Sequence, residues 1–249
     1  MADADEEKGR QLLSAVERLI TSNEKLLEVV AQAEETAKER SPLVAKQKDT
    51  LKGLTAQQLT RVYSNRAAIA GGASAVPALI PGVGTIAAGV AGTLAELAYV
   101  LKCEVELCLS IAHVYGFDIE DQKERQLAFL LAAVSTYDSD GKNFLADVIR
   151  AEGVAIWNYS PRVIGRIVVK AMTALALSYV GRGLTRMIPV LGIVIGSGMN
   201  KVLTQRVGDR AARELRTRRE LMRAEPTVPE GKRLAKKAKS KKKKLKGAA

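Results

Sequence analysis

The residue types that could do chemistry in this chain gather on one apolar stretch with helical periodicity. They recur at intervals of seven, three, four and three residues, which is one face of a helix: Glu96, Cys103, Glu106, Ser110 and His113. A carboxylate pair, a thiol, a hydroxyl and an imidazole in one row could line a polar cavity or handle protons. The row also fits a half-exposed helix face, or polar groups that are hydrogen-bonded within a bundle.

Metal binding and catalysis find little support in the rest of the sequence. His113 is the only histidine, so a zinc site would need cysteines and carboxylates to complete it. Cys103 and Cys108 lack CxxC spacing and face different sides of one helix, so we expect reduced thiols. The chain contains no Gly-x-Ser-x-Gly, His-Glu-x-x-His or P-loop motif. We therefore expect no catalytic residue, no metal, no cofactor and no enzyme activity.

Two similar apolar segments, 80–92 and 188–200, lie about a hundred residues apart. Each begins with Ile-Pro, places a glycine three residues after the proline, and continues with small residues every fourth position: Pro81, Gly84, Ala88 and Gly92 in the first, Pro189, Gly192, Gly196 and Asn200 in the second. Small residues at this spacing let another helix backbone approach closely, in a membrane or in a tight bundle. The sequence therefore predicts two apolar helical hairpins, which fit a buried core, a re-entrant hairpin or a membrane-inserting hairpin.

The elements that must position these residues are predicted to be helices throughout. Apolar periodicity predicts an all-α fold, a single helical bundle with these helices: 4–40, 43–66, 83–115, 121–136, 142–154, 162–182 and a last long helix that starts at Pro189. Gly116 is expected to end the third helix in a left-handed conformation, and Asp121 to cap the next one. We divide the chain into a charged N-terminal helix (1–42), a helical core (43–224) and a disordered Lys-rich tail (225–249).

Charge is distributed unevenly along the chain. The net charge is +12, yet residues 62–161 hold six basic and eleven acidic residues, whereas 232–246 hold ten basic residues and no acid. This asymmetry predicts a polyanionic partner for the C-terminal end. The candidate anion- or lipid-binding side chains are Arg213, Arg216, Arg219, Lys236, Lys237, Lys241, Lys242, Lys243 and Lys244. The acidic start of the chain lacks the apolar stretch of a secretory signal peptide.

The ordered set of motifs resembles the EcsC protein family over roughly residues 45–220. The positions that carry the resemblance are Pro81, Gly84, Glu96, Tyr115, Gly116, Pro189, Gly192, Gly196 and Asn200. Glu96 stands where an Asp is usual in that family, so the carboxylate is kept on a longer side chain. The resemblance implies a bacterial, all-helical protein with no securely assigned reaction. The long N-terminal helix and the Lys-rich tail look like additions to the family core.

Two functions remain compatible with the sequence. In the first, the chain associates with the cytoplasmic face of the cell membrane through its apolar hairpins and basic tail, as an accessory to a transporter or secretion process with a membrane protein as partner. In the second, the Lys-rich tail binds nucleic acid or polyphosphate and the helices serve as a scaffold. The tail contains no aromatic residue, so base stacking is not indicated.

Overall fold

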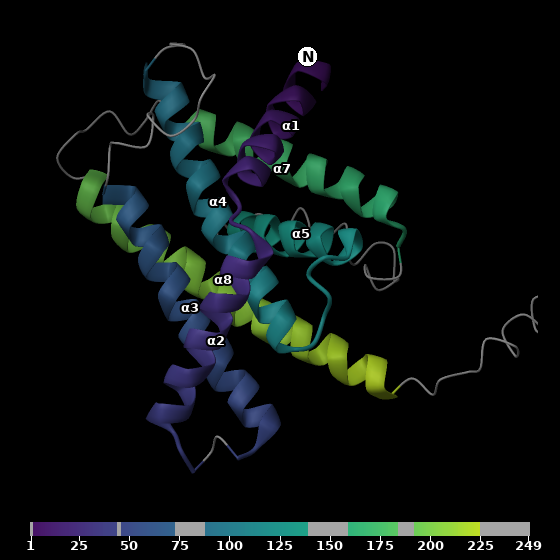
Figure 1. Ribbon diagram of the computed structural model, residues 1–249. Helices are drawn as coiled ribbons and strands as arrows, with labels where there is room; N and C mark the ends of the chain where they lie inside the picture. The colour runs from purple at the N-terminus through teal and green to yellow at the C-terminus, as the bar shows by residue number, and fades with distance from the viewer. Residues whose placement is uncertain (1, 44–45, 73–87, 139–158, 184–191, 225–249) are drawn as a thin grey trace, which may run out of the picture. The chain divides into compact units, whose positions relative to one another are not determined.

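The computed structural model describes residues 2–43, 46–72, 88–138, 159–183 and 192–224 (Figure 1). These residues form seven helices and no strand, which confirms the predicted all-α class: α1 (Ala2–Leu19), α2 (Asn23–Arg40), α3 (Lys48–Gly72), α4 (Ala88–Val114), α5 (Gln122–Asp138), α7 (Pro161–Gly183) and α8 (Gly192–Ala224). The predicted helix at 142–154, the proline-led starts of both apolar segments and the Lys-rich tail lie outside the described residues. The chain divides into a large compact unit, 1–215, and a small one, 216–249.

The N-terminal segment forms two helices, α1 and α2, so the prediction of a single helix over 4–40 is wrong. The break between α1 and α2 falls at Ile20, Thr21 and Ser22, where Ser22 has an extended backbone with φ −63° and ψ 157°. The N–H of Thr21 donates to the Glu106 carboxylate at 2.8 Å. The break is thus held by a buried acceptor 85 residues away, and Thr21, Ser22 and the following Asn23 are residue types that favour helix N-caps.

Helix α4 is the central helix of the large unit and packs against α1, α2, α3, α5 and α7. Five of its large apolar side chains are fully buried: Leu97, Leu101, Leu107, Leu109 and Ile111. Most side chains between Ala95 and Ala112 are buried, the polar Glu104, Glu106 and Ser110 among them. This part of α4 is therefore a core helix. No helix among the described residues is long and apolar enough to span a membrane.

The C-terminal end of α4 turns sharply at Gly116, as the sequence predicted. Gly116 has φ 84°, and its N–H donates to the carbonyl of His113 at 2.8 Å. The N–H of Phe117 donates to the carbonyl of Ala112 at 3.0 Å. This pair of bonds is the Schellman arrangement, which satisfies helix carbonyls that would otherwise have no partner. Asp121 then caps α5 by accepting from the N–H of Lys123 at 2.6 Å.

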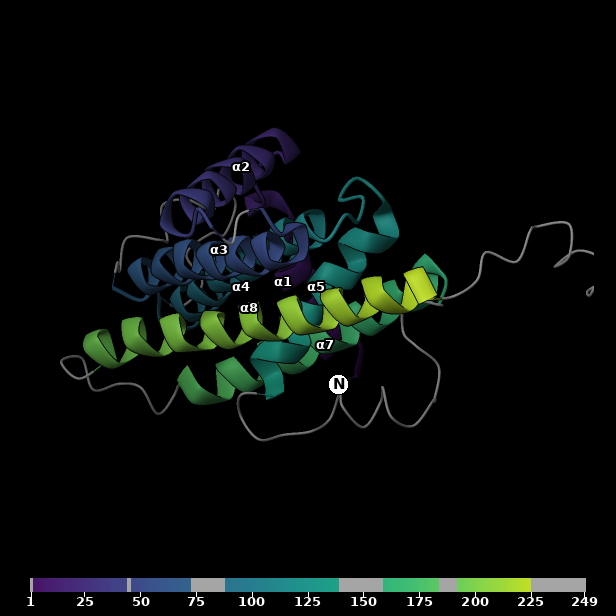
Figure 2. The ribbon, with the colours of Figure 1, turned by 90° about the horizontal axis from the view of Figure 1, so that it is seen from below.

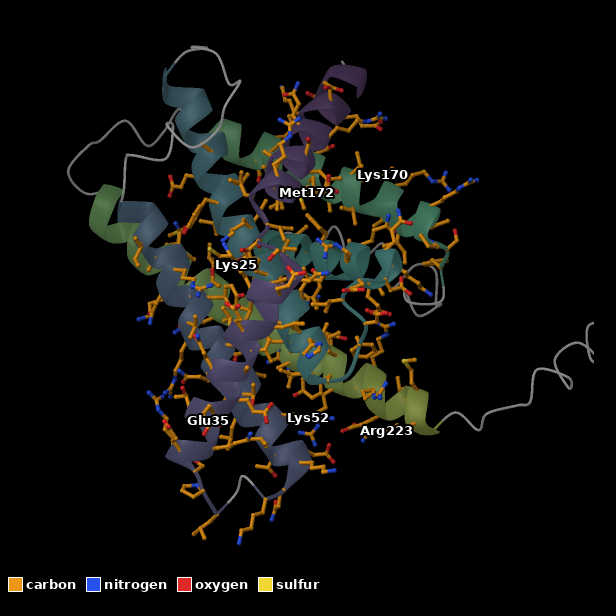
Figure 3. The ribbon with its side chains drawn as sticks, in the orientation of Figure 1. Lys25, Glu35, Lys52, Lys170, Met172 and Arg223 are labelled. Carbon is orange, nitrogen blue, oxygen red and sulfur yellow. The ribbon has the colours of Figure 1, made fainter. Side chains whose placement is uncertain are left out.

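Helix α7 is amphipathic, and its basic residues up to Lys170 lie on the exposed side. Arg166 and Lys170 are exposed, whereas Met172 is fully buried. In Figure 3, Lys170 extends away from the ribbon of α7. These charges therefore belong to a solvated face and do not enter the core.

The first part of α8 lies against α3 and α4 within the large unit (Figure 2). Gly208 faces Thr60 of α3 so closely that a Cβ at Gly208 would lie 2.7 Å from Thr60 Cγ2. Val207, Ala211 and Leu215 are buried in the same core. One side of α8 is thus fixed by packing, while its opposite side faces solvent.

Helices α1 and α7 cross at a glycine, and this contact yields a stability prediction. A Cβ at Gly9 would lie 2.7 Å from the backbone nitrogen of Thr173. We expect Gly9→Ala to lower the free energy of unfolding by about 1–3 kcal/mol, because the two backbones must separate. A Cβ at Gly53 of α3 would meet no atom within 4 Å, so Gly53→Ala should stabilise by about 0.5–1 kcal/mol. Urea unfolding measures both variants, and equal effects would contradict the account.

Candidate functional site

Helix α4 carries three carboxylates, and each contacts a different part of the fold. Glu104 and Glu106 are fully buried, and Glu96 is half-buried. Residues two apart on a helix are about 200° apart around its axis, so Glu104 and Glu106 point to nearly opposite sides of α4. The three side chains therefore build separate polar contacts rather than one acidic pocket.

Glu106 joins α4 to the junction of α1 and α2. Its Oε2 lies 3.0 Å from Lys102 Nζ, one helical turn away, and its Oε1 accepts from the N–H of Thr21 at 2.8 Å. The same junction is held from α5, because Arg125 Nη1 donates to Asn23 Oδ1 at 3.0 Å. A buried charge is tolerated when it is paired and hydrogen-bonded, and Glu106 meets both conditions.

Cys103 and Ser110, the thiol and the hydroxyl of the predicted polar row, also lie in the core. Ser110 Oγ and the Tyr63 hydroxyl of α3 are 3.3 Å apart. Burial raises the pKa of Tyr63 to about 12 and the pKa of Cys103 to about 12, and it also raises the pKa of Cys108. Both cysteines are free, buried thiols, and they remain protonated at neutral pH. Such thiols are poor nucleophiles.

The row of five polar residues is divided between the core and the surface. Cys103, Glu106 and Ser110 are buried, Glu96 is half-buried, and His113 at the end of α4 is exposed. Among the described residues, no group of three or more His, Cys, Asp or Glu side chains could hold a metal ion. The arrangement ties helices together instead of presenting a reactive cluster to solvent.

Glu96 meets a residue from the second apolar segment. Asn200 Nδ2 of α8 donates to Glu96 Oε1 at 3.3 Å. Both were singled out in the sequence as motif positions, and the fold brings them together across 104 residues. Of the other motif positions, Tyr115 is buried at the end of α4, and Gly192 and Gly196 lie in the first turns of α8. Pro81, Gly84 and Pro189 lie outside the described residues.

Glu104 is the buried carboxylate that sequence reasoning missed. Its Oε2 lies 2.5 Å from Thr136 Oγ1 of α5, and its Oε1 accepts from Thr204 Oγ1 of α8 at 3.3 Å. Burial raises its pKa to about 7, although the two hydroxyls act to lower it. One feature of the sequence could have identified it: Glu104 lies on the apolar side of the helix, about 80° around the helix axis from Glu96. A charged residue at such a position needs partners from neighbouring helices.

The exposed face of α8 presents apolar and basic side chains at helical spacing, with one exposed acidic residue, Asp209, beside them. Met199 is 46% exposed and Val202 is 45% exposed, and Arg206 and Arg213 follow on the same side of the helix and are exposed. We call these four residues the α8 face. Of the other arginines predicted to bind anions, Arg216 forms an ion pair with Glu220 at 2.9 Å and Arg219 is half-buried. The six lysines of the tail named above lie outside the described residues.

Comparison with known proteins assigns the chain to a family. The model of the EcsC protein family matches residues 7–219. The match begins within α1, so α1 and α2 lie inside the matched range and not outside the family core as the sequence suggested. Comparison with curated proteins and with solved structures gives no match. Since the family model covers most of its length, this chain belongs to the EcsC protein family.

Proposed function

We propose that the chain is a peripheral membrane protein that binds an anionic lipid surface through the α8 face and the Lys-rich segment after it. The observation that carries this proposal is the exposure of Met199 and Val202 beside Arg206 and Arg213 on one side of α8. Helices that lie in a membrane interface combine these two kinds of side chain, because apolar groups enter the acyl boundary while basic groups contact headgroups.

The charge of the C-terminal third supports the electrostatic part of this binding. Residues 232–246 contribute ten basic residues and no acid. Each basic residue near an anionic surface contributes about 1 kcal/mol. Engagement of half of them would hold the protein at a membrane at moderate salt. The contact is screened within a Debye length, so binding should weaken as the ionic strength rises.

A membrane surface fits the α8 face better than a nucleic acid does. Sequence-independent binding to phosphates requires basic side chains only, and single-stranded nucleic acid is usually held by aromatic side chains as well. The tail contains no aromatic residue, and two half-exposed apolar side chains have no role on a phosphate backbone. On a lipid surface both would be buried. The cytoplasmic leaflet is the anionic surface that we propose for this contact.

Vesicle binding tests the proposal. We expect the full chain to sediment with vesicles that contain phosphatidylglycerol and not with vesicles of phosphatidylcholine alone. A chain that ends at Glu230 should bind the anionic vesicles more weakly and keep the preference for them, because the α8 face remains. Equal sedimentation with both vesicles, or none with either, would contradict the proposal. Tighter binding to duplex DNA than to anionic vesicles would favour the polyphosphate function instead.

A further inference from the structure

Glu104 is not part of the surface that we propose to bind lipid. It lies on α4 and faces α5 and α8, and its side chain is fully buried. Each carboxyl oxygen meets one hydroxyl: Oε2 meets Thr136 and Oε1 meets Thr204. An isolated carboxylate in such a place is strongly disfavoured unless a cation pairs with it.

The hydrogen atoms available at this site favour the acid form of Glu104. Thr136 Oγ1 lies 2.5 Å from Glu104 Oε2 and 2.9 Å from the carbonyl oxygen of Ala132. A threonine hydroxyl has one hydrogen, so it cannot donate to both. If Glu104 carries the proton, the acid donates to Thr136, Thr136 donates to Ala132, and Oε1 still accepts from Thr204. If Glu104 is ionised, the one hydroxyl hydrogen of Thr136 can serve only one of these two contacts, and the other contact has no hydrogen.

We propose that Glu104 is a proton-binding site that joins α4 to α5 and α8, and that loss of its proton weakens the packing of these helices. The proposal stands independently of lipid binding, although α8 also carries the α8 face. At this position a carboxylic acid can donate a hydrogen bond, which a carboxylate cannot do. The ligand of this site is therefore the proton itself.

In the part of the chain that the structure describes, the groups around Glu104 supply no counter-charge. The titratable groups that face it are Cys103 and Cys108 on its own helix, and Glu104 helps to raise the pKa of each. From α5 and α8 it meets the hydroxyls of Thr136 and Thr204, which do not titrate. Among the described residues, no basic side chain of α3, α5, α7 or α8 contributes to its pKa, which burial raises from 4.5 to about 7.

The direction of the pH effect follows from this shift. A carboxyl that binds its proton more tightly in the folded state stabilises the fold fully below its unfolded pKa. That stabilisation is lost as the pH rises through the folded value of about 7. The equilibrium constant for unfolding should therefore rise on the order of 50-fold between about pH 5 and pH 8 through this group alone.

Unfolding of the full chain by urea at several pH values tests the proposal. Glu104→Gln imitates the acid form, since its amide can donate to Thr136 and its oxygen can accept from Thr204. We expect this variant to lack the roughly 50-fold dependence and to be more stable than the wild type at about pH 8. Glu96→Gln is the control, because Glu96 is half-buried on the same helix and also contacts α8; it should keep the wild-type profile. Parallel profiles for the wild type and Glu104→Gln would overturn the proposal.

A second measurement decides the question even if Glu104→Gln does not fold. The carbon-13 resonance of the Glu104 carboxyl in the full wild-type chain reports its protonation directly. We expect its midpoint near neutral pH. A midpoint in the ordinary range of glutamate, about 4.3, would overturn the proposal.

Discussion

Replacement of Glu106 with alanine is expected to lower the free energy of unfolding by about 3–5 kcal/mol, the usual result of removing one partner of a buried ion pair. The Lys102 side chain is only 17% exposed and would lose the carboxylate 3.0 Å away. The N–H of Thr21 would lose its acceptor as well. Both losses occur where the junction of α1 and α2 packs against α4. We therefore expect the packing of this junction against α4 to weaken.

Glu106→Gln is the matched variant that separates these two contributions. Its amide oxygen can still accept from Thr21, whereas the ion pair with Lys102 is lost. We expect a destabilisation between that of Glu106→Ala and the wild type in urea unfolding, and retained amide protection at Thr21 in hydrogen exchange. A Glu106→Ala protein within about 1 kcal/mol of the wild type would show that the ion pair and the junction contact are not stabilising.

The parts of the fold that could be predicted from sequence depend on local interactions. The end of α4 at Gly116 follows from a glycine that can adopt positive φ directly after an apolar helix, and the structure has φ 84° there. The cap at Asp121 follows from a side chain that accepts from a neighbouring N–H. Each of these signals lies within a few residues of the feature that it predicts.

The features that could not be predicted depend on distant partners. At the break after α1, the N–H of Thr21 donates to Glu106, which is 85 residues away in the sequence. Glu104 gained its partners only when α5 and α8 packed against α4. Helical spacing grouped Glu106 with His113, yet one is fully buried and the other exposed. Which residues of a polar row are buried is decided by the neighbouring helices, so helical spacing alone could not separate Glu106 from His113.

The apolar residues of the α8 face give the second large effect. We expect Met199→Gln combined with Val202→Gln to weaken binding to anionic vesicles on the order of tenfold to a hundredfold, because two partly exposed apolar side chains no longer enter the bilayer boundary. Glutamine keeps helix propensity close to that of methionine, and both positions are near half-exposed. The fold should therefore be preserved, as far-ultraviolet circular dichroism can verify.

A matched pair elsewhere on the surface serves as the control. Leu27 of α2 is 39% exposed and Leu177 of α7 is 37% exposed. Leu27→Gln combined with Leu177→Gln removes a comparable amount of exposed apolar surface outside the α8 face. This control should bind anionic vesicles as tightly as the wild type does. A general effect of replacing exposed apolar side chains would instead weaken binding in both double variants.

The most direct test is the dissociation constant of the Met199→Gln, Val202→Gln chain for phosphatidylglycerol vesicles, measured beside its dissociation constant for duplex DNA at the same salt concentration. We expect weaker binding to the vesicles with unchanged binding to DNA, since only a lipid surface buries these two side chains. Unchanged binding to the vesicles, or an equal loss for both ligands, would contradict the assignment of the α8 face to an anionic membrane.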